Sequence, residues 1–336
     1  MGIRYLNKYF RESCKNDSIK IISMSQLSGK KIAIDISIYL YKFIGDKQLI
    51  ENMYQMLSIF RYYNIIPIFI FDGKPPAEKK ELLIMRRQEK IEAEKEYKQL
   101  KVSLENNSQI DEQERQDIIN NMDLLKKKFI YISKYQIETT KNLIRYYGMT
   151  YYDAPCEADK LCAILNIKGK VWACMSEDMD MFVYGCKYIL KYFSLLNHTA
   201  ALYDTKKILK TLDITLTELK EICVLSGTDY NVYDKNKNSR IRDLNSTLKY
   251  FNKYRQQKTK NITCKSDFYT WLYENSDYID DYNELKNTFD LFDLENDENV
   301  KELEIFENIK IINRNVDYFN INEILKQDGF IFPNNL

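Results

Sequence analysis

Ile68-Phe-Ile-Phe-Asp-Gly-Lys-Pro-Pro76 is the stretch of sequence that decides the fold. Its apolar, β-branched and aromatic half predicts a buried strand over residues 65–71, and the glycine and prolines stop that strand just after Asp72. The pattern recurs in Lys31-Ile-Ala-Ile-Asp-Ile-Ser37, and residues 146–152 and 170–175 predict two more strands. Helical periodicity fills residues 50–63, 137–147 and 156–167. This alternation predicts an α/β fold, a mostly parallel central sheet with helices on both faces.

Seven carboxylates follow or end these apolar runs. They are Asp35, Asp72, Glu157, Asp159, Asp178, Asp180 and Asp229. Any one of them is equally typical of a helix cap or a turn, but functional groups of parallel sheets collect beyond the carboxyl ends of the strands. Two like charges about 5 Å apart repel by roughly 3 kcal/mol at an effective dielectric constant of about 20. A cluster of seven therefore predicts divalent cations held by oxygen ligands.

Two pairs of these acids have a spacing that predicts their directions. Asp178 and Asp180, two apart in an extended chain, are expected to point to the same side. Glu157 and Asp159, two apart at the start of a helix, are expected to point about 200° apart. The second pair is therefore expected to serve different metals, or one metal through water.

Composition restricts the class of protein. With 336 residues, 45% of them hydrophobic and 29% charged, the chain is expected to form one large globular domain or two smaller ones. No apolar run approaches the roughly 20 residues of a membrane span. Seven cysteines without a CxxC pair indicate reduced thiols in an intracellular setting, and a single histidine, His198, argues against a zinc site. The net charge of +1 does not by itself predict nucleic-acid binding.

Residues 78–135 contain neither glycine nor proline and are rich in charged residues. They predict a long helix over 78–104 and a second helix that opens with the capping box Ser108-Gln-Ile-Asp111 and ends near 128. Composition alone is equally typical of a solvated helical hairpin. Its position between Asp72 and the rest of the sheet places it over the acids, which favours a lid or gate.

Read in order, the motifs resemble those of the flap endonuclease (XPG/Rad2-type) family of structure-specific 5′ nucleases. They are Met1-Gly-Ile3, Ile32-Ala-Ile-Asp-Ile-Ser37, Phe71-Asp-Gly-Lys-Pro-Pro76, Ala154-Pro-Cys-Glu-Ala-Asp159, Ser176-Glu-Asp-Met-Asp180 and Gly227-Thr-Asp-Tyr230. Each motif is weak alone, but six in the correct order are specific. The resemblance implies a PIN-like nuclease core over residues 1–230, with 78–135 as a helical arch. It implies a helical C-terminal region over 231–336 with a degenerate helix-hairpin-helix segment for duplex binding.

The resemblance also implies a role for the acids and for two basic residues. The seven acids match the family's metal ligands, which implies two Mg²⁺ (or Mn²⁺) ions about 3.5–4 Å apart around the scissile phosphate. Asp159 stands where most members have a glutamate. Lys79 and Arg86, two helical turns apart on one face, match the catalytic lysine and arginine that hold this phosphate. The alternative for Lys79 and Arg86 is a solvated helix face.

Three further residues match DNA-contacting positions more weakly. Gly2 resembles the family's N-terminal glycine, which lies near the active site. Tyr39 or Tyr41 matches the aromatic that stacks on a base near the cleavage point. With 27 tyrosines in the chain, a core or surface role is the alternative for both.

The chain departs from the family after Asp229. Members usually continue with a Gly-Ile-Gly-Pro-Lys-Arg-Ala hairpin, whose backbone amides grip duplex phosphates together with a potassium ion. Residues 231–243 contain no glycine here, so this grip is in doubt. The basic side chains of the segment are the candidates for phosphate contacts, with a solvated loop as the alternative: Lys235, Lys237, Arg240 and Arg242. We predict a weaker or differently placed duplex grip.

The C-terminus, Gln327-Asp-Gly-Phe-Ile-Phe-Pro333, is a poor match to a sliding-clamp peptide, and no nuclear import tail is visible. This reduced form is similar to the flap-endonuclease-like proteins of large cytoplasmic DNA viruses, including poxviruses. The expectation is a monomeric 5′ flap endonuclease or 5′ exonuclease that acts on branched or flapped DNA in replication, repair or recombination. Its expected place is the nucleus, or the host cytoplasm if the chain is viral.

Three alternatives stay open. A Holliday-junction-type resolvase and a PIN-like RNase would use the same core, and a non-catalytic DNA-binding recombination factor would keep only a relic site. A phosphatase of the haloacid-dehalogenase type is disfavoured because Asp35 and Asp72 lack an Asp-x-Asp pair.

Overall fold

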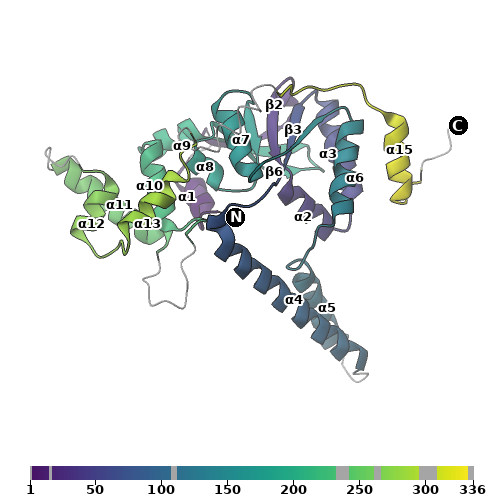
Figure 1. The fold of residues 1–336 in the computed structure, drawn as a ribbon, viewed down its shortest axis with the longest axis horizontal. Helices are drawn as coiled ribbons and strands as arrows, with labels where there is room; N and C mark the ends of the chain where they lie inside the picture. Colours follow the sequence, from purple (N-terminus) through teal and green to yellow (C-terminus); the bar gives the residue numbers. More distant parts are fainter. Residues whose placement is uncertain are drawn as a thin grey trace.

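The computed structural model describes residues 2–14, 17–106, 112–231, 242–260, 266–294 and 309–331. Its centre is a seven-stranded sheet in the order β1-β7-β6-β5-β2-β3-β4 (Figure 1). The strands are β1 (Ile19–Ser23), β2 (Lys31–Asp35), β3 (Ile66–Phe71), β4 (Thr150–Asp153), β5 (Ala173–Met175), β6 (Tyr188–Ser194) and β7 (Thr199–Asp204). Strands β2 to β6 pair in parallel, whereas β7 runs antiparallel to both β6 and β1. The predicted mostly parallel sheet is therefore confirmed, and the antiparallel edge is an addition.

Helices cover both faces of this sheet. The helices on one face are α1 (Leu6–Ser13), α7 (Ala158–Ile167), α8 (Asp180–Tyr184), α9 (Thr205–Leu212) and α10 (Leu216–Ser226). Those on the other are α2 (Ser37–Gly45), α3 (Leu49–Tyr62), α6 (Lys134–Tyr146) and α15 (Tyr318–Gln327). Three further helices pack against α10, beyond the sheet (Figure 1): α11 (Leu244–Lys260), α12 (Phe268–Asn275) and α13 (Tyr282–Asp290). A short 3₁₀ turn, η1 (Met24–Leu27), follows β1.

Alternation along the strands explains the two apolar cores. On β2, Ile32 and Ile34 pack into the core beneath α2 and α3, whereas Ala33 packs into the opposite core. Strand β3 repeats this with Phe69 on one face and Ile70 on the other. Because both faces are buried, the central strands read as continuous apolar runs, which is how the sequence revealed them.

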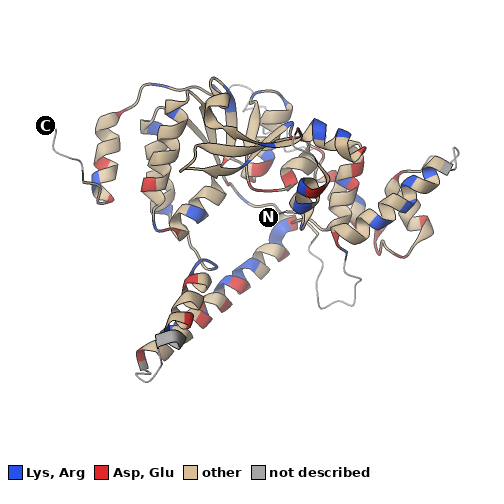
Figure 2. Cartoon of the chain, turned by 180° about the vertical axis from the view of Figure 1, so that it is seen from behind, with Lys and Arg blue, Asp and Glu red and all other residues tan. Residues whose placement is uncertain are grey.

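A helical arm leaves the sheet directly after Asp72. It consists of η2 (Ala77–Lys79), the long α4 (Lys80–Asn106) and the antiparallel α5 (Glu112–Lys126), and it projects away from the core (Figure 1). Ala93 and Leu125 are buried between the two helices, and charges of both signs alternate along the arm (Figure 2). The predicted helical hairpin is thus present, although its first residues form a 3₁₀ turn. The predicted capping box at residues 108–111 lies outside the described residues.

The chain returns to the core after its C-terminal helices. The Arg314 amide donates to the Gly148 carbonyl over 2.7 Å, and the Asp317 amide donates to the Tyr146 carbonyl over 2.7 Å. Helix α15 then packs Ile321 and Leu325 into the core that contains α3 and α6. The predicted domain boundary at residue 230 stays a prediction. Across the described ranges, no helix is both long and apolar enough to cross a membrane.

Candidate functional site

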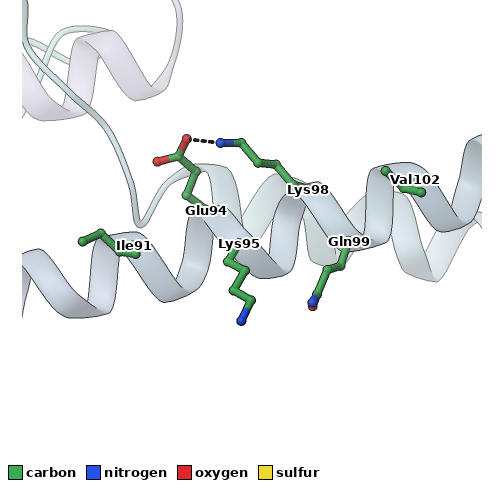
Figure 3. A pocket seen from close by; sticks show the side chains of 6 residues that line it. All are labelled: Ile91, Glu94, Lys95, Lys98, Gln99 and Val102. Carbon is green, nitrogen blue, oxygen red and sulfur yellow. Dashed lines mark ion pairs between the residues drawn. The ribbon is translucent and has the colours of Figure 1, made fainter.

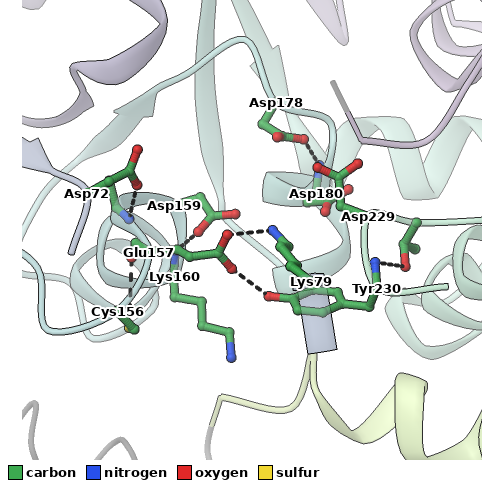
Figure 4. A network of polar contacts seen from close by, with 12 residues as sticks. Asp72, Lys79, Cys156, Glu157, Asp159, Lys160, Asp178, Asp180, Asp229 and Tyr230 are labelled. Carbon is green, nitrogen blue, oxygen red and sulfur yellow. Dashed lines mark hydrogen bonds and ion pairs between the residues drawn. The ribbon is translucent and has the colours of Figure 1, made fainter. Parts of the chain in front are cut away.

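The fold brings the seven predicted carboxylates to one edge of the sheet. Asp35 ends β2 opposite Ile70 of β3, and Asp72 follows β3 directly. The remaining five come from the N-terminus of α7, from the loop between β5 and α8 with the first residue of α8, and from the loop after α10: Glu157, Asp159, Asp178, Asp180 and Asp229. Figure 4 shows six of the seven around one region. The parallel strand direction brings six of these acids together, as the sequence predicted, whereas α10 carries Asp229 to the same edge.

Two serines orient the acids at the ends of the strands. Ser37 donates through its amide to Asp35 Oδ1 over 3.2 Å and through its hydroxyl to Asp72 Oδ2 over 2.5 Å. Ser176 donates through its hydroxyl to Asp35 Oδ2 over 3.2 Å and accepts from the Asp178 amide over 3.1 Å. Neither serine was among the site residues predicted from the sequence. Their position inside two of the acidic motifs was the available signal.

The expected divergence of Glu157 and Asp159 is wrong. Glu157 precedes α7 with an extended backbone, φ −81° and ψ 144°, so the helical rotation between the two residues does not apply. Instead, both carboxylates lie close enough to Lys79 for their charges to raise its pKa. The Lys79 Nζ atom lies 2.8 Å from Glu157 Oε1.

Asp178 and Asp180 do lie together, but through a turn rather than an extended chain. The Asp180 amide donates to Asp178 Oδ1 over 3.0 Å, and Asp180 is the first residue of α8. Gly2 lies against both, because a Cβ added to it would meet Asp178 Oδ1 at 2.4 Å and Asp180 Oδ1 at 2.5 Å. The N-terminal segment therefore reaches the acids, where the resemblance implies it should be.

Burial and mutual repulsion raise the pKa of several of these carboxyls. Burial is the largest cause for Asp35, followed by the charges of Asp72 and Asp178, and together they raise its pKa to about 7. The pKa of Asp159 and that of Asp180 are also raised, again chiefly by burial. Such groups favour either protonation or a nearby cation.

The donor set fits a hard divalent cation. All seven side chains offer carboxylate oxygens, the ligands that Mg²⁺ and Mn²⁺ prefer. Within the described residues, both Asp180 oxygens are buried without a hydrogen-bond partner. In the same part of the chain, no three acidic, histidine or cysteine side chains already enclose a single point as ligands do. The fit therefore rests on the donor chemistry and on the unpartnered Asp180 carboxylate.

Both predicted basic residues reach this acidic edge. Burial alone lowers the pKa of Lys79, but the carboxylates of Asp159 and Glu157 outweigh it and raise the pKa above its ordinary value. Arg86, on the first turns of α4, places Nη2 2.8 Å from Asp229 Oδ2. The base of the helical arm is thus ion-paired to the acids at two points.

The two candidate stacking tyrosines differ in their exposure to solvent. Tyr39 is 3% exposed and packs against Phe43 and Phe193, so it is not presented to a DNA base and is removed from the predicted contacts. Tyr41 is 42% exposed, and Asp72 contributes to the raised pKa of its hydroxyl after burial. Tyr41 therefore keeps the position that a base-stacking residue needs.

The predicted duplex contacts receive little support. Lys235, Lys237 and Arg240 lie outside the described residues. The side chain of Arg242 is only 8% exposed and forms an ion pair with Asp280, so it is not presented to a phosphate. Arg242 is therefore removed from the predicted contacts.

A hollow of about 700 Å³ lies elsewhere, on the outer face of α4 (Figure 3). It is lined by Ile91, Glu94, Lys95, Lys98, Gln99 and Val102. None of these residues belongs to the acidic edge. The chemistry of the molecule is therefore concentrated at the sheet edge rather than in this hollow.

A mostly parallel sheet with an acidic carboxyl edge, and with a helical arm inserted after its second parallel strand, has the fold of the PIN-like nucleases. Two family models match the chain, the XPG N-terminal domain over residues 1–93 and the XPG I-region over residues 148–229. The chain belongs to the XPG/Rad2-type flap endonuclease family.

Individual relatives agree with this placement. Flap endonuclease 1 of Methanococcus aeolicus is 30% identical over 235 residues, which cover 65% of this chain and 68% of the relative. Flap endonuclease 1 of Leishmania infantum is 30% identical over 252 residues, 68% of this chain and 60% of the relative. The chain thus spans about 60% of the length of the latter. The narrower viral placement stays a prediction.

Solved structures show the same fold across most of the chain. The catalytic core of Rad2 in complex with DNA substrate is 16% identical, with a TM-score of 0.58, and the match covers 97% of this chain and 95% of that one. Flap endonuclease-1 from Methanococcus jannaschii is 21% identical, with a TM-score of 0.53, and the match covers 92% and 90%.

Proposed function

We propose that this protein is a metal-dependent, structure-specific nuclease that cuts branched or flapped DNA with a 5′ end. The observation that carries the proposal is the convergence of seven carboxylates on one sheet edge, with the buried Asp180 carboxylate left unpartnered among the described residues. An acidic cluster of this kind is costly unless it holds cations. Its family membership gives the cluster a reaction to perform.

The carboxylates are the residues that would hold two Mg²⁺ or Mn²⁺ ions. They are Asp35, Asp72, Glu157, Asp159, Asp178, Asp180 and Asp229. When bound, such ions supply an activated water and neutralise charge on the scissile phosphate and the leaving oxygen. Ser37 and Ser176 keep the strand-end carboxylates in fixed orientations through the hydrogen bonds described above.

Lys79 and Arg86 supply the fixed positive charge of the site. Both belong to the base of the helical arm, and both contact the acids through ion pairs of 2.8 Å. In the reaction they would bind the scissile phosphate and offset the charge that grows in the transition state. Tyr41 would stack on a base beside the cut.

The arm itself would select the substrate. Helix α4 starts immediately after Lys79, so a DNA strand bound at the acids would lie beside the base of the arm. We infer that the arm admits single-stranded 5′ flaps. As a DNA-processing nuclease of replication, repair or recombination, the protein would act inside the cell as a monomer.

The test is a cleavage assay on a panel of substrates. End-labelled 5′-flap, nicked, gapped and four-way DNA, together with single-stranded RNA, are incubated with the protein and Mg²⁺. We expect the 5′ flap to be cut most rapidly and near its junction. Preferred cleavage of the four-way junction would indicate a resolvase, preferred cleavage of RNA would indicate an RNase, and binding without cleavage would indicate a recombination factor.

A further inference from the structure

Tyr230 lies at the meeting point of three acid-bearing segments. It directly follows Asp229 in the loop after α10. Its hydroxyl lies 3.0 Å from Glu157 Oε2, at the start of α7, and 3.1 Å from the Tyr184 hydroxyl on α8, the helix that begins with Asp180. One side chain therefore connects the loop after α10 with α7 and α8.

The ring of Tyr230 carries Lys79. The Lys79 Nζ atom lies 4.6 Å from the ring centroid, within the range of a cation–π interaction (Figure 4). Lys79 is only 5% exposed, and a buried ammonium gains more from an aromatic face than a solvated one does. The ring thus contributes to holding the ammonium at the acidic edge.

Tyr230, Lys79 and Glu157 form a closed network of three contacts. Lys79 Nζ contacts Glu157 Oε1 at 2.8 Å, and the Tyr230 hydroxyl donates to the other oxygen of the same carboxylate, Oε2. Glu157 is therefore fixed at both oxygens, one through an ion pair and one through a hydroxyl. Removing the Tyr230 hydroxyl would leave Oε2 without this hydrogen bond, so the Glu157 carboxylate could rotate more freely.

The network continues into the C-terminal region. Phe292 packs edge-on against Tyr230 at 5.3 Å between ring centroids and contacts Tyr184 at 5.1 Å. Phe292 is 1% exposed and lies two residues after Asp290, the last residue of α13. The orientation of the Tyr230 ring therefore depends on the packing of the C-terminal helices against the core.

We propose that Tyr230 is a positioning residue for the nuclease reaction: its ring places Lys79 and its hydroxyl places Glu157. This inference rests on the proposed function for its effect on cleavage, but its two contacts can be tested without cleavage. Tyr230 would act without contacting the substrate. Through Phe292, the packing of the C-terminal region would influence the orientation of Tyr230 and therefore of Glu157.

Two variants separate the two contacts. Tyr230→Phe keeps the ring and removes the hydroxyl, so Mn²⁺ affinity measured by calorimetry should fall about ten-fold, the usual effect of losing an outer partner of a metal ligand. Labelling of Lys79 by acetic anhydride, measured by mass spectrometry against Lys80, should stay unchanged. Tyr230→Leu removes both contacts, so Mn²⁺ affinity should fall and labelling of Lys79 should rise several-fold.

Cleavage rates test the coupling between Tyr230 and Lys79 in a double-mutant cycle. Under single-turnover conditions with saturating flap DNA and Mg²⁺, Tyr230→Leu should be about ten-fold slower than Tyr230→Phe, since it also loses the ring that faces the Lys79 ammonium. In a Lys79→Ala background the rate difference between the two variants should shrink, because the ring has then lost the Lys79 contact and keeps only the more distant Lys160 Nζ atom at 5.8 Å among the described residues. Flap affinity measured in EDTA should be the same for Tyr230→Phe and the unaltered protein, since both keep the Lys79 contact with the ring.

Tyr254 provides a matched control. It is 2% exposed in α11, its hydroxyl donates to the Ser266 carbonyl over 3.0 Å, and Lys258 Nζ lies 5.1 Å from its ring. Tyr254→Phe and Tyr254→Leu make the same chemical changes away from the acids. Both should leave Lys79 labelling and Mn²⁺ affinity unchanged.

An equal Leu-to-Phe rate ratio with and without Lys79 would overturn the inference, as would unchanged Lys79 labelling in Tyr230→Leu. If Tyr230→Leu fails to fold, unchanged Mn²⁺ affinity in Tyr230→Phe would overturn it. Failure of the proposed function looks different: the unaltered protein would then cleave no DNA. Lys79 labelling would still decide the positioning role in that case.

Discussion

Asp180→Asn should make the metal-free protein more stable, which is unusual for a change at a fully buried residue. Asp180 is 0% exposed, and its two oxygens have no hydrogen-bond partner among the described residues. Burial raises the pKa of its carboxyl most, and the charges of Asp178 and Asp229 raise it further. In the unfolded chain the same carboxyl has an ordinary pKa of about 3.9.

The size of the effect follows from this difference. Holding this carboxyl inside the protein, whether ionised or neutralised by a bound proton, costs the folded state roughly several kcal/mol. Asparagine avoids that cost but leaves a buried amide poorly satisfied, at about 1–3 kcal/mol. A net gain of about 1–3 kcal/mol follows, which is several degrees in Tm. Because the folded pKa is the higher one, the unaltered protein loses stability as pH rises above about 4, and the variant's advantage grows with pH.

Divalent metal should reverse the order. A metal that binds only the folded protein stabilises it by about 2.7 kcal/mol at one hundred times its Kd. Asp180→Asn removes one of the ligands, so this gain should largely disappear. Thermal unfolding followed by far-UV circular dichroism, in EDTA and in Mn²⁺, measures both effects.

The control is Asp213→Asn, at an exposed position where Asp213 pairs with Arg255. It should change stability by less than about 0.5 kcal/mol in either buffer. An Asp180→Asn protein that is less stable than the unaltered one in EDTA would show that the buried carboxyl does not destabilise the metal-free fold. Equal stabilisation of both proteins by Mn²⁺ would show that Asp180 is not one of the metal ligands.

Three further changes test other parts of the site and fold. Gly2→Ala places a methyl group against two carboxylates at 2.4 and 2.5 Å and should weaken Mn²⁺ binding and cleavage, whereas Gly29→Ala, at a nearly identical φ of +70° but with nothing within 4 Å, should leave both unchanged. Ser176→Ala removes the hydroxyl that joins Asp35 to the Asp178 amide and should lower Mn²⁺ affinity about ten-fold, with Ser176→Thr retaining most of it; equal affinities in calorimetry would contradict this. Burial and the charge of Asp267 raise the pKa of Glu221 to about 8, so the protein should lose stability between about pH 4.5 and 8. Glu221→Gln should remove this dependence and be more stable at pH 8.5 by about 2–4 kcal/mol in urea unfolding; parallel pH profiles would show otherwise.

The sequence predicted the sheet through its doubly buried strands and missed the rest for a physical reason. Strands β2 and β3 were visible because both of their faces are apolar. Strand β6 was not predicted because it contains a charged residue, Lys191. This lysine is buried all the same, since its ammonium donates to the Glu177 carbonyl. The overlap of helix and strand near residue 147 is resolved by Gly148, whose φ of +69° ends α6 before β4 begins.

The site was more predictable from motif order than from local geometry. Six of the seven acids lie at the sheet edge because parallel strands emerge there, and Asp229 reaches the same edge from the end of α10. The relative directions of Glu157 and Asp159 were mispredicted because the helix starts one residue after Glu157. Tyr39 was mispredicted because burial on a helix depends on neighbours such as Phe193, which sequence spacing does not reveal.

Single-turnover cleavage of a 5′-flap DNA in Mg²⁺ tests the central claim most directly, with the unaltered protein and Asp178→Ala side by side. The assay also records the affinity of both proteins for the flap in EDTA and their thermal unfolding. We predict cleavage near the flap junction by the unaltered protein, and none by Asp178→Ala despite intact folding and flap binding. Undiminished cleavage by Asp178→Ala, or no Mg²⁺-dependent cleavage by the unaltered protein, would show that the acidic edge is not a metal-dependent nuclease site.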